Sequence, residues 1–195
     1  MNLEPGIEAR GGDVSNHFFK AFRLVPTIAY RIFTKHGMGR FSDEGRFVAD
    51  LRPWWPLEPY LAALFEINDA VGSAKMVEIG KLIEKHVSVP PSMRDIRTTF
   101  ASIDVAYHLN HRKHGKPMFD LASGRMTDGI GHYVYNGEES GNFFTMETDA
   151  PYPCDVDRGI LSGFARRFEP RSFVEHAAGR CRKQGNSVCV FEVSW

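Results

Sequence analysis

The 195-residue sequence lacks features that mark several common protein classes. Its longest apolar stretches, such as 61–65, are far too short to cross a bilayer, so we expect no membrane span. Residues 1–16 are polar and contain no hydrophobic segment of the secretory kind, so we expect no signal peptide and a cytoplasmic location. The chain has three cysteines, an odd number, which argues against a disulfide scaffold and favours metal binding or buried thiols.

The sequence also has no excess of charge of either sign, because 24 Lys and Arg residues balance 24 Asp and Glu residues. A nucleic-acid-binding domain needs a basic face, so we expect no nucleic-acid partner. A local basic group is interpreted as a solvated helix end; it comprises Arg112, Lys113, Lys116 and Arg125. The sequence contains no G-x-S-x-G run, no Cys–His protease signature, no Walker loop and no G-x-G-x-x-G run. Nothing in it requires an enzyme.

Apolar residues are plentiful: 43% are hydrophobic and 12% aromatic, with fifteen Phe. This composition excludes a disordered chain and indicates either a large aromatic core or an apolar pocket. Pro5, Gly6, Gly11 and Gly12 break any regular pattern, so residues 1–14 are predicted to be a flexible arm. Residues 15–195 are predicted to be a single ligand-binding domain.

The hydrophobic spacing predicts helices in the first half and mainly strands in the second. Pro26 should kink or split the first helix, and Ser92 with Asp95 predicts a capping box at the start of a long helix that closes at Gly115. The predicted helices span Ser15–Lys35, Leu57–Val71, Ser73–His86, Ser92–Gly115 and Asp155–Phe168, with a loop at Arg40–Pro56. The predicted strands span Arg125–Asn136, Asn142–Asp149, Ser172–Ala177 and Ser187–Trp195. We therefore predict an α+β fold, with an N-terminal helical layer on a four-stranded antiparallel sheet and a ββαββ C-terminal unit.

Cys154, Cys181 and Cys189, with His176 and Glu175 nearby, form the first candidate site. Thiolates are soft ligands that suit Zn²⁺, and three cysteines with His176 would supply the four ligands of a closed structural site. Three buried thiols that act as small hydrophobic groups are the alternative.

A second candidate site lies on the long helix, where Asp104, His108 and His111 share one face. These side chains could bind a metal, act as an acid–base pair or supply an axial haem ligand. They could equally be the polar end of a helix, where cationic side chains favour the macrodipole.

The segments 154–164 and 181–191 resemble the 4-vinyl-reductase domain family. The shared pattern is a cysteine, a helix that opens with a glycine, and a late C-x₇-C turn with an internal glycine. The resemblance covers about 89–195. It implies a sensory or accessory domain in which Cys154, Cys181 and Cys189 bind a structural zinc beside an aromatic-ligand pocket. Related sites place an acidic ligand at the position of Ala178, so His176 or Glu175 would have to replace it.

The same resemblance implies a fold related to the haem nitric-oxide-binding fold and to transport-particle subunits. Haem-binding members of that fold hold the propionates with a Y-x-S-x-R run. The segment 133–137 offers no such run, so haem is not expected here.

We therefore predict a non-catalytic sensor domain that binds a small apolar or aromatic molecule and carries a structural zinc. It would signal through a partner protein or a homodimer. The predicted pocket residues are Trp54, Trp55, Phe100, Tyr107, His108, His111, Tyr133 and Phe144, and the predicted metal ligands are Cys154, His176, Cys181 and Cys189. The alternatives are a haem- or tetrapyrrole-binding or -processing protein that depends on a metal, and a protein-interaction module without a ligand.

Overall fold

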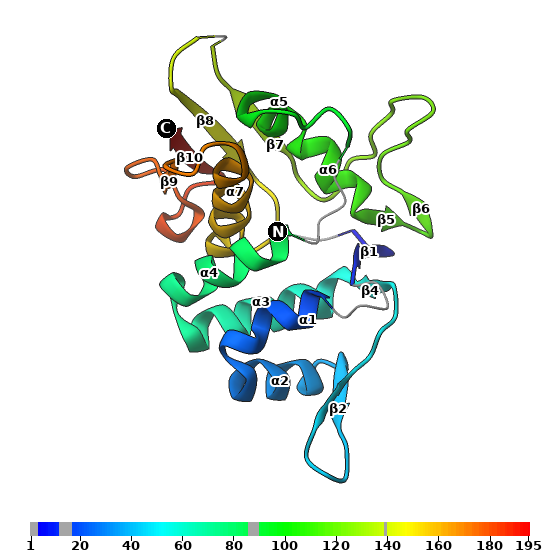
Figure 1. Ribbon diagram of the computed structural model, residues 1–195. Coiled ribbons are helices and arrows are strands. Elements are labelled where there is room, and N and C mark those ends of the chain that lie inside the picture. Colours follow the sequence, from blue (N-terminus) through cyan, green and yellow to red (C-terminus); the bar gives the residue numbers. More distant parts are fainter. Residues whose placement is uncertain (1–3, 12–16, 86–89, 139) are drawn as a thin grey trace.

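The computed structural model describes residues 4–11, 17–85, 90–138 and 140–195 (Figure 1). The N-terminal half forms a layer of helices, in which Pro26 occupies the first turn of a helix, where its missing N–H costs nothing. These helices are α1 (His17–Ala21), the short 3₁₀ helix η1 (Phe22–Leu24), α2 (Pro26–Lys35), α3 (Leu57–Val71) and α4 (Ser73–Glu84). The predicted break at Pro26 is confirmed, and the mixture of helices and antiparallel sheets confirms the α+β class.

The C-terminal half contains the predicted four-stranded antiparallel sheet and ββαββ unit. Its elements are β7 (Tyr133–Asn136), β8 (Phe143–Thr148), α7 (Cys154–Phe168), β9 (Phe173–His176), η2 (Arg182–Gln184) and β10 (Cys189–Ser194). The strand order is β7-β8-β10-β9, so β10 is central. Alternate residues of β8 are buried against α7 and its neighbours. The strand predicted over 125–136 is shorter than expected, because Gly129 and Gly131 take positive φ angles and turn the chain before β7.

A second sheet corrects the predicted N-terminal arm over residues 4–11, while residues 1–3 and 12–14 of that prediction lie outside the described residues. Residues 7–10 form β1 (Ile7–Arg10), which lies between β4 (Trp54–Pro56) and β5 (His111–Lys113), with β6 (Lys116–Pro117) at the edge. Glu8 binds Arg112 at 2.5 Å, and Glu4 forms an ion pair with Lys113. Part of the predicted basic group is therefore neutralised by the segment that we expected to be flexible. The predicted loop at 40–56 is also wrong, since β2 (Gly39–Phe41) pairs with β3 (Phe47–Ala49) and is followed by β4.

The long helix predicted over 92–115 is two short helices, α5 (Ile96–Ala101) and α6 (Ile103–Leu109). Ser102 separates them, and its hydroxyl lies 2.8 Å from that of Ser92. The predicted capping box is displaced by three residues: Asp95, rather than Ser92, is the N-cap, and it exchanges hydrogen bonds with Thr98. Because α6 ends at Leu109, His111 belongs to a strand and leaves the helical face that it was predicted to share.

Replacing Asp95 with alanine is expected to lower the free energy of unfolding by about 1 kcal/mol, because an N-cap side chain satisfies an otherwise unpaired backbone N–H. The carboxylate accepts the backbone N–H of Thr98 at 2.8 Å. Chemical denaturation would measure the change. Ser92→Ala is the matched control and should cost less; an equal loss in the two variants would contradict the assigned cap.

Helix α7 packs against α4 and connects the two halves of the molecule (Figure 1). Gly80 of α4 faces Gly159 of α7, and the two backbones approach closely enough that a Cβ built on Gly80 would lie 2.6 Å from the carbonyl oxygen of Val156. Acidic residues occur in the first turn of α7 and arginines in its last, which suits the helix dipole. The glycine pair fixes how α7 crosses the helical layer.

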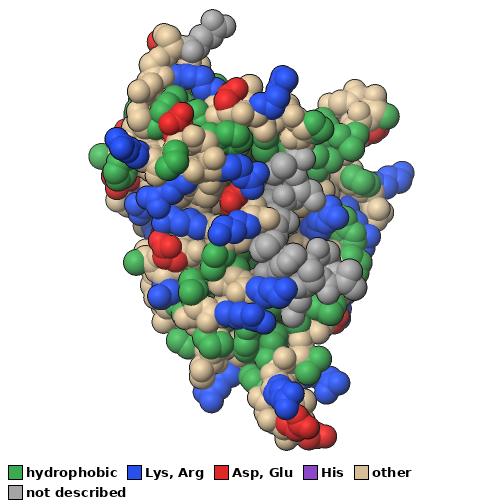
Figure 2. Space-filling model, viewed as in Figure 1, with side chains coloured by type: hydrophobic (Ala, Val, Ile, Leu, Met, Phe, Trp, Pro, Cys, Tyr) green, Lys and Arg blue, Asp and Glu red, His purple; other side chains and the backbone are tan. Residues whose placement is uncertain are grey.

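Apolar side chains are gathered in the interior, and most charged side chains lie on the surface. Two clusters of buried apolar side chains form the core, one in the helical half and one between α7 and the C-terminal sheet. Figure 2 shows basic side chains gathered across the middle of the face that carries α4 and α7, with a few acidic ones beside them. Among the described residues, every helix is too short or too polar to pass through a membrane.

Candidate functional site

The three cysteines and His176 converge at one end of the C-terminal sheet. Cys154 begins α7, Cys181 precedes η2, and Cys189 begins β10 beside the end of β9. One ligand atom from each of these residues and from His176 lies within 4.8 Å of the others. The Sγ atom of Cys181 is 3.7 Å from both other sulfurs. Glu175, the alternative fourth ligand, instead faces Arg158 at 3.6 Å.

The electrostatics of this cysteine cluster favour one thiolate. A hydrogen bond from Cys154, reinforced by donors from Arg182, lowers the pKa of Cys189 to about 3. The same sulfur contact, together with burial, raises the pKa of the Cys154 thiol. The Nε2 atom of His176 is buried and has no hydrogen-bond partner. Three soft sulfurs and a buried imidazole nitrogen without a partner are a donor set suited to a closed, four-coordinate zinc site.

Arg182 links the cysteine cluster to the interior of the molecule. Its backbone N–H and Nε donate to Cys189 at 3.4 and 3.3 Å. Its guanidinium also donates to the carbonyl oxygens of Ala150 and Tyr152 and to the carboxylate of Asp157, the last at 3.1 Å. Burial raises the pKa of Asp157 to about 7, and the charge of Arg182 opposes that rise. Sequence reasoning missed Arg182 and Asp157, although Arg182 directly follows a predicted metal ligand.

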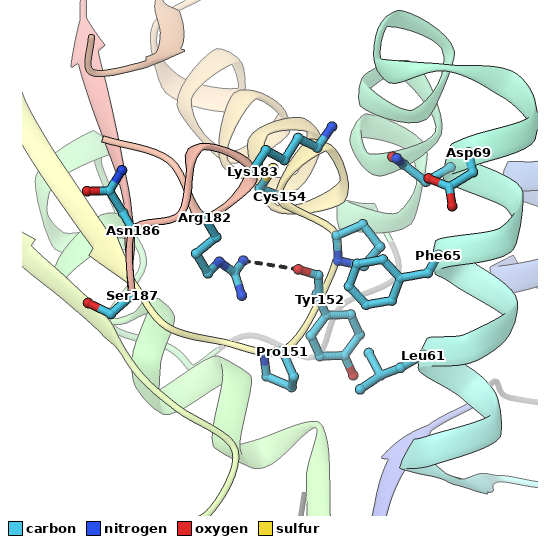
Figure 3. Close-up of a pocket in the computed structure, with 12 residues that line it drawn as sticks. Leu61, Phe65, Asp69, Pro151, Tyr152, Cys154, Arg182, Lys183, Asn186 and Ser187 are labelled. Atoms are coloured by element: carbon cyan, nitrogen blue, oxygen red, sulfur yellow. Dashed lines mark hydrogen bonds between the residues drawn. The ribbon is translucent and has the colours of Figure 1, made fainter. Parts of the chain in front are cut away.

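A cavity of about 880 Å³ lies between α3 and the loop that carries Cys181 and Cys189 (Figure 3). Its volume is in the range of small-molecule sites. Leu61 and Phe65 of α3 form an apolar wall, and Arg182 and Lys183 come from the opposite side. Lys183 is half exposed and pairs with Asp155 at 2.5 Å. The cavity therefore combines an apolar surface with cationic groups next to the cysteine cluster.

The aromatic side chains behind the cavity form a hydrogen-bonded cluster. Tyr152 lines the cavity, and its hydroxyl lies 2.6 Å from Nε2 of His111. The other ring nitrogen of His111 bonds to the carbonyl oxygen of Tyr107 at 2.7 Å. Burial lowers the pKa of His111 to about 4, so the imidazole is neutral at pH 7. Its Nδ1 therefore donates to the carbonyl oxygen, and its Nε2 lone pair faces Tyr152.

The eight predicted pocket residues do not form one wall. None of them lines the cavity. The link between the cavity and these residues is Tyr152, which lines the cavity and hydrogen-bonds to His111. Trp55 is buried in β4, and Trp54 lies under Arg112 at 4.8 Å. Phe100 packs on Phe144 at 4.7 Å inside the C-terminal core.

The remaining predicted residues surround the aromatic cluster. Tyr107 contacts the rings of His111 and Tyr133 at 4.6 and 5.1 Å. His108 faces Asp104 and His132. Asp104 and His108 therefore lie together as predicted, but the third residue of the group is His132 rather than His111.

Comparisons with known proteins identify the fold. No protein-family model and no curated protein sequence matches the chain, so the resemblance to the 4-vinyl-reductase family is not confirmed. Solved structures of H-NOX proteins do match. An H-NOX protein from S. oneidensis in the Fe(II)NO state aligns with a TM-score of 0.57 at 12% identity, over 91% of this chain and 96% of that one. A mutant H-NOX of T. Tengcongensis gives a TM-score of 0.58 at 14% identity, over 93% and 94%.

A further match, from work on the function of heme distortion in the H-NOX family, has a TM-score of 0.58 at 14% identity, over 92% and 91%. These identities establish an H-NOX-like fold and nothing finer. They also correct the expectation that haem is absent, because the matching structures include haem proteins. The missing Y-x-S-x-R run is therefore not a sufficient reason to exclude haem.

Among the described side chains, His111 is the candidate haem-iron ligand that contacts a residue lining the cavity. A neutral histidine whose Nδ1 donates to a carbonyl oxygen, and whose Nε2 is unprotonated, has the arrangement that an axial ligand needs. His111 has this arrangement, and its Nε2 accepts a hydrogen bond from Tyr152, a residue that lines the cavity. The Tyr152 hydroxyl would have to turn away from Nε2 for an iron to bind there.

Proposed function

We propose that this chain is a sensor domain that binds haem or a related tetrapyrrole beside the cavity between its two halves. The observation that carries the proposal is the contact of the buried, neutral His111 with cavity-lining Tyr152, within a fold shared with H-NOX proteins. In this proposal His111 holds the iron and Leu61 and Phe65 contact the ring. Lys183 and Arg182 supply positive charge for acid groups. The output passes to a partner protein or to a second copy of the chain.

A bound haem iron supplies a coordination position for a small ligand such as a diatomic gas. The protein's own residues have separate tasks. The hydrogen bond from His111 to the carbonyl oxygen of Tyr107 fixes the ring orientation and keeps Nε2 unprotonated. The burial of His111 prevents its protonation near neutral pH. The apolar side of the cavity excludes water from the ring.

Titration of the purified chain with haemin, followed by absorption spectroscopy, tests the proposal. We expect one haem per chain, and His111→Ala should weaken binding on the order of tenfold and change the spectrum of the iron. His36→Ala is the matched control, because His36 binds Glu66 on the helical layer and should leave the titration unchanged. Identical binding and spectra in wild type and His111→Ala would contradict the assignment of His111.

We also propose that the cysteine cluster holds a structural zinc, which would fix β10 and η2 against the start of α7. The three sulfurs and His176 support this proposal by their mutual proximity. Elemental analysis of protein purified without added metal should find about one zinc per chain. Cys181→Ser and Cys189→Ser should lose the metal and unfold at lower denaturant concentration, whereas His36→Ala should keep it. A metal-free wild-type chain of full stability would count against the zinc site.

A further inference from the structure

Asp104, His108 and His132 form a second group of metal-ligating side chains, away from the cysteine cluster. Asp104 and His108 lie one turn apart on α6, and His132 directly precedes β7. The carboxylate of Asp104 joins the two elements: one oxygen accepts the backbone N–H of Tyr133 at 2.9 Å, and the other lies 3.0 Å from Nδ1 of His132. The position of the carboxylate is therefore fixed from both sides.

The donor atoms of this group are already close together. One donor atom from each of the three residues lies within 4.8 Å of the other two. Metal–nitrogen and metal–oxygen bonds are about 2.1 Å long, so donors around one ion stand roughly 3 to 4 Å apart. Small side-chain movements would therefore bring all three donors onto one ion.

The imidazole of His108 has a nitrogen that the protein does not use. The side chain is fully buried, and its Nδ1 lies 2.8 Å from the carbonyl oxygen of Asp104 and 3.5 Å from its carboxylate. Its Nε2 is buried and has no hydrogen-bond partner. A buried polar atom without a partner costs free energy and requires an explanation, which a bound metal ion would supply.

The other two ligands leave the site open to solvent. The side chain of His132 is 37% exposed and that of Asp104 is 22% exposed. Asp128 is almost fully exposed, and its carboxylate lies 3.4 Å from Nε2 of His132. An ion could therefore enter from this side, attract a second carboxylate and keep coordination positions for water or a small ligand.

We propose that Asp104, His108 and His132 bind a divalent first-row transition-metal ion. Two imidazoles and one carboxylate with open positions are the donor set of mononuclear non-haem iron(II) centres, so iron(II) is the ion that the site suits best. The site shares no residue with the cysteine cluster or with the His111–Tyr152 contact, and it is independent of the proposed haem and zinc. A hydrogen-bonded His–Asp–His group without metal is the alternative that the experiment must exclude.

Cobalt(II) is a suitable probe, because thiolate ligands give it a charge-transfer absorption that imidazole and carboxylate ligands do not. The chelator-treated full chain would be titrated with cobalt(II) by calorimetry and by absorption. We expect a binding event without the thiolate band, weakened on the order of tenfold or more by His132→Ala and by Asp104→Asn. The surface position of His132 makes its variant the safer of the two for folding.

His176→Ala is the matched control, since it removes a histidine from the cysteine cluster. It should alter the thiolate band and leave the other binding event unchanged. A wild-type chain that shows no cobalt binding beyond that of His132→Ala would overturn the proposal, whether or not the cysteine cluster binds metal. Equal affinities in wild type, His132→Ala and Asp104→Asn would overturn it as well.

Discussion

Gly159→Ala is expected to lower the free energy of unfolding by about 2 kcal/mol or more, because overpacking a closely packed interior forces backbone shifts. A Cβ on Gly159 would lie 2.7 Å from Cα of Gly80 and would overlap the carbonyl oxygen of Val77. Both neighbours are backbone atoms, which cannot move aside as a flexible side chain can. In a helix without close neighbours, the same substitution would raise the free energy of unfolding by up to about 1 kcal/mol. A destabilising effect would therefore indicate that the backbones of α4 and α7 are in close contact at Gly159.

Denaturant unfolding of Gly159→Ala, Gly80→Ala and the exposed control Arg166→Ala would test this prediction. Gly80→Ala should also destabilise, because its Cβ would meet the backbone of Val156 and Gly159. Arg166 lies on the exposed side of α7, so its variant should change stability by less than about 0.5 kcal/mol. A Gly159→Ala variant as stable as wild type would show that α4 and α7 do not cross as closely as described.

Arg182→Met is expected to cost about 3 kcal/mol at pH 8, because it leaves a buried carboxylate without its cation. Asp157 is 1% exposed and holds Arg182 at 3.1 Å. The folded pKa of Asp157, about 7, lies above the ordinary value of 3.8. This carboxyl group therefore favours folding fully below about pH 4, and that contribution is lost as the pH rises through 7. At pH 5 the carboxyl of Asp157 is protonated and needs no cation, so Arg182→Met should cost less there.

The measurement is denaturant unfolding of metal-free protein at pH 5 and pH 8. Arg180→Met is the matched control: Arg180 is largely exposed and reaches Glu147 at 3.5 Å, so it should change stability by less than about 0.5 kcal/mol. Adding Asp157→Asn to Arg182→Met should recover part of the loss at pH 8. A penalty that is the same at both pH values would contradict the role assigned to Asp157.

The sequence predicts the second half of the fold better than the first, for a physical reason. The strands β8 and β10 are six residues long, so their alternating apolar positions stand out against the helical period of α7. The strands β1, β2, β3 and β4 have three or four residues each, which is too short for a period to be visible. The pairing of β1 with β4 and β5 also joins segments that are distant in the sequence, which no local pattern indicates.

The same distinction explains which candidate residues the sequence identifies. The three cysteines are rare and soft, so their type alone indicates a common site, and the fold brings them together with His176. His132 could not be predicted as a partner of Asp104, because helical spacing reveals only neighbours on the same helix. The choice of His111 assumed one long helix, and Ser102 and the end of α6 at Leu109 interrupt it. Asp95 is the N-cap because its partner at the third helical position is Thr98. The usual capping-box pattern has Glu or Gln at that position, so it does not point to Asp95.

The strand order of the C-terminal sheet also bears on how the chain is made. During synthesis β7, β8 and β9 emerge before β10, yet β10 lies between β8 and β9 and pairs with both. The hairpin of β7 and β8 can form early, but β9 must wait without a neighbour until β10 arrives. The cysteine cluster has the same timing, because Cys189 begins β10. The inner edge of β8 and the strand β9 therefore stay unpaired until β10 has been synthesised, so this half of the fold is completed late.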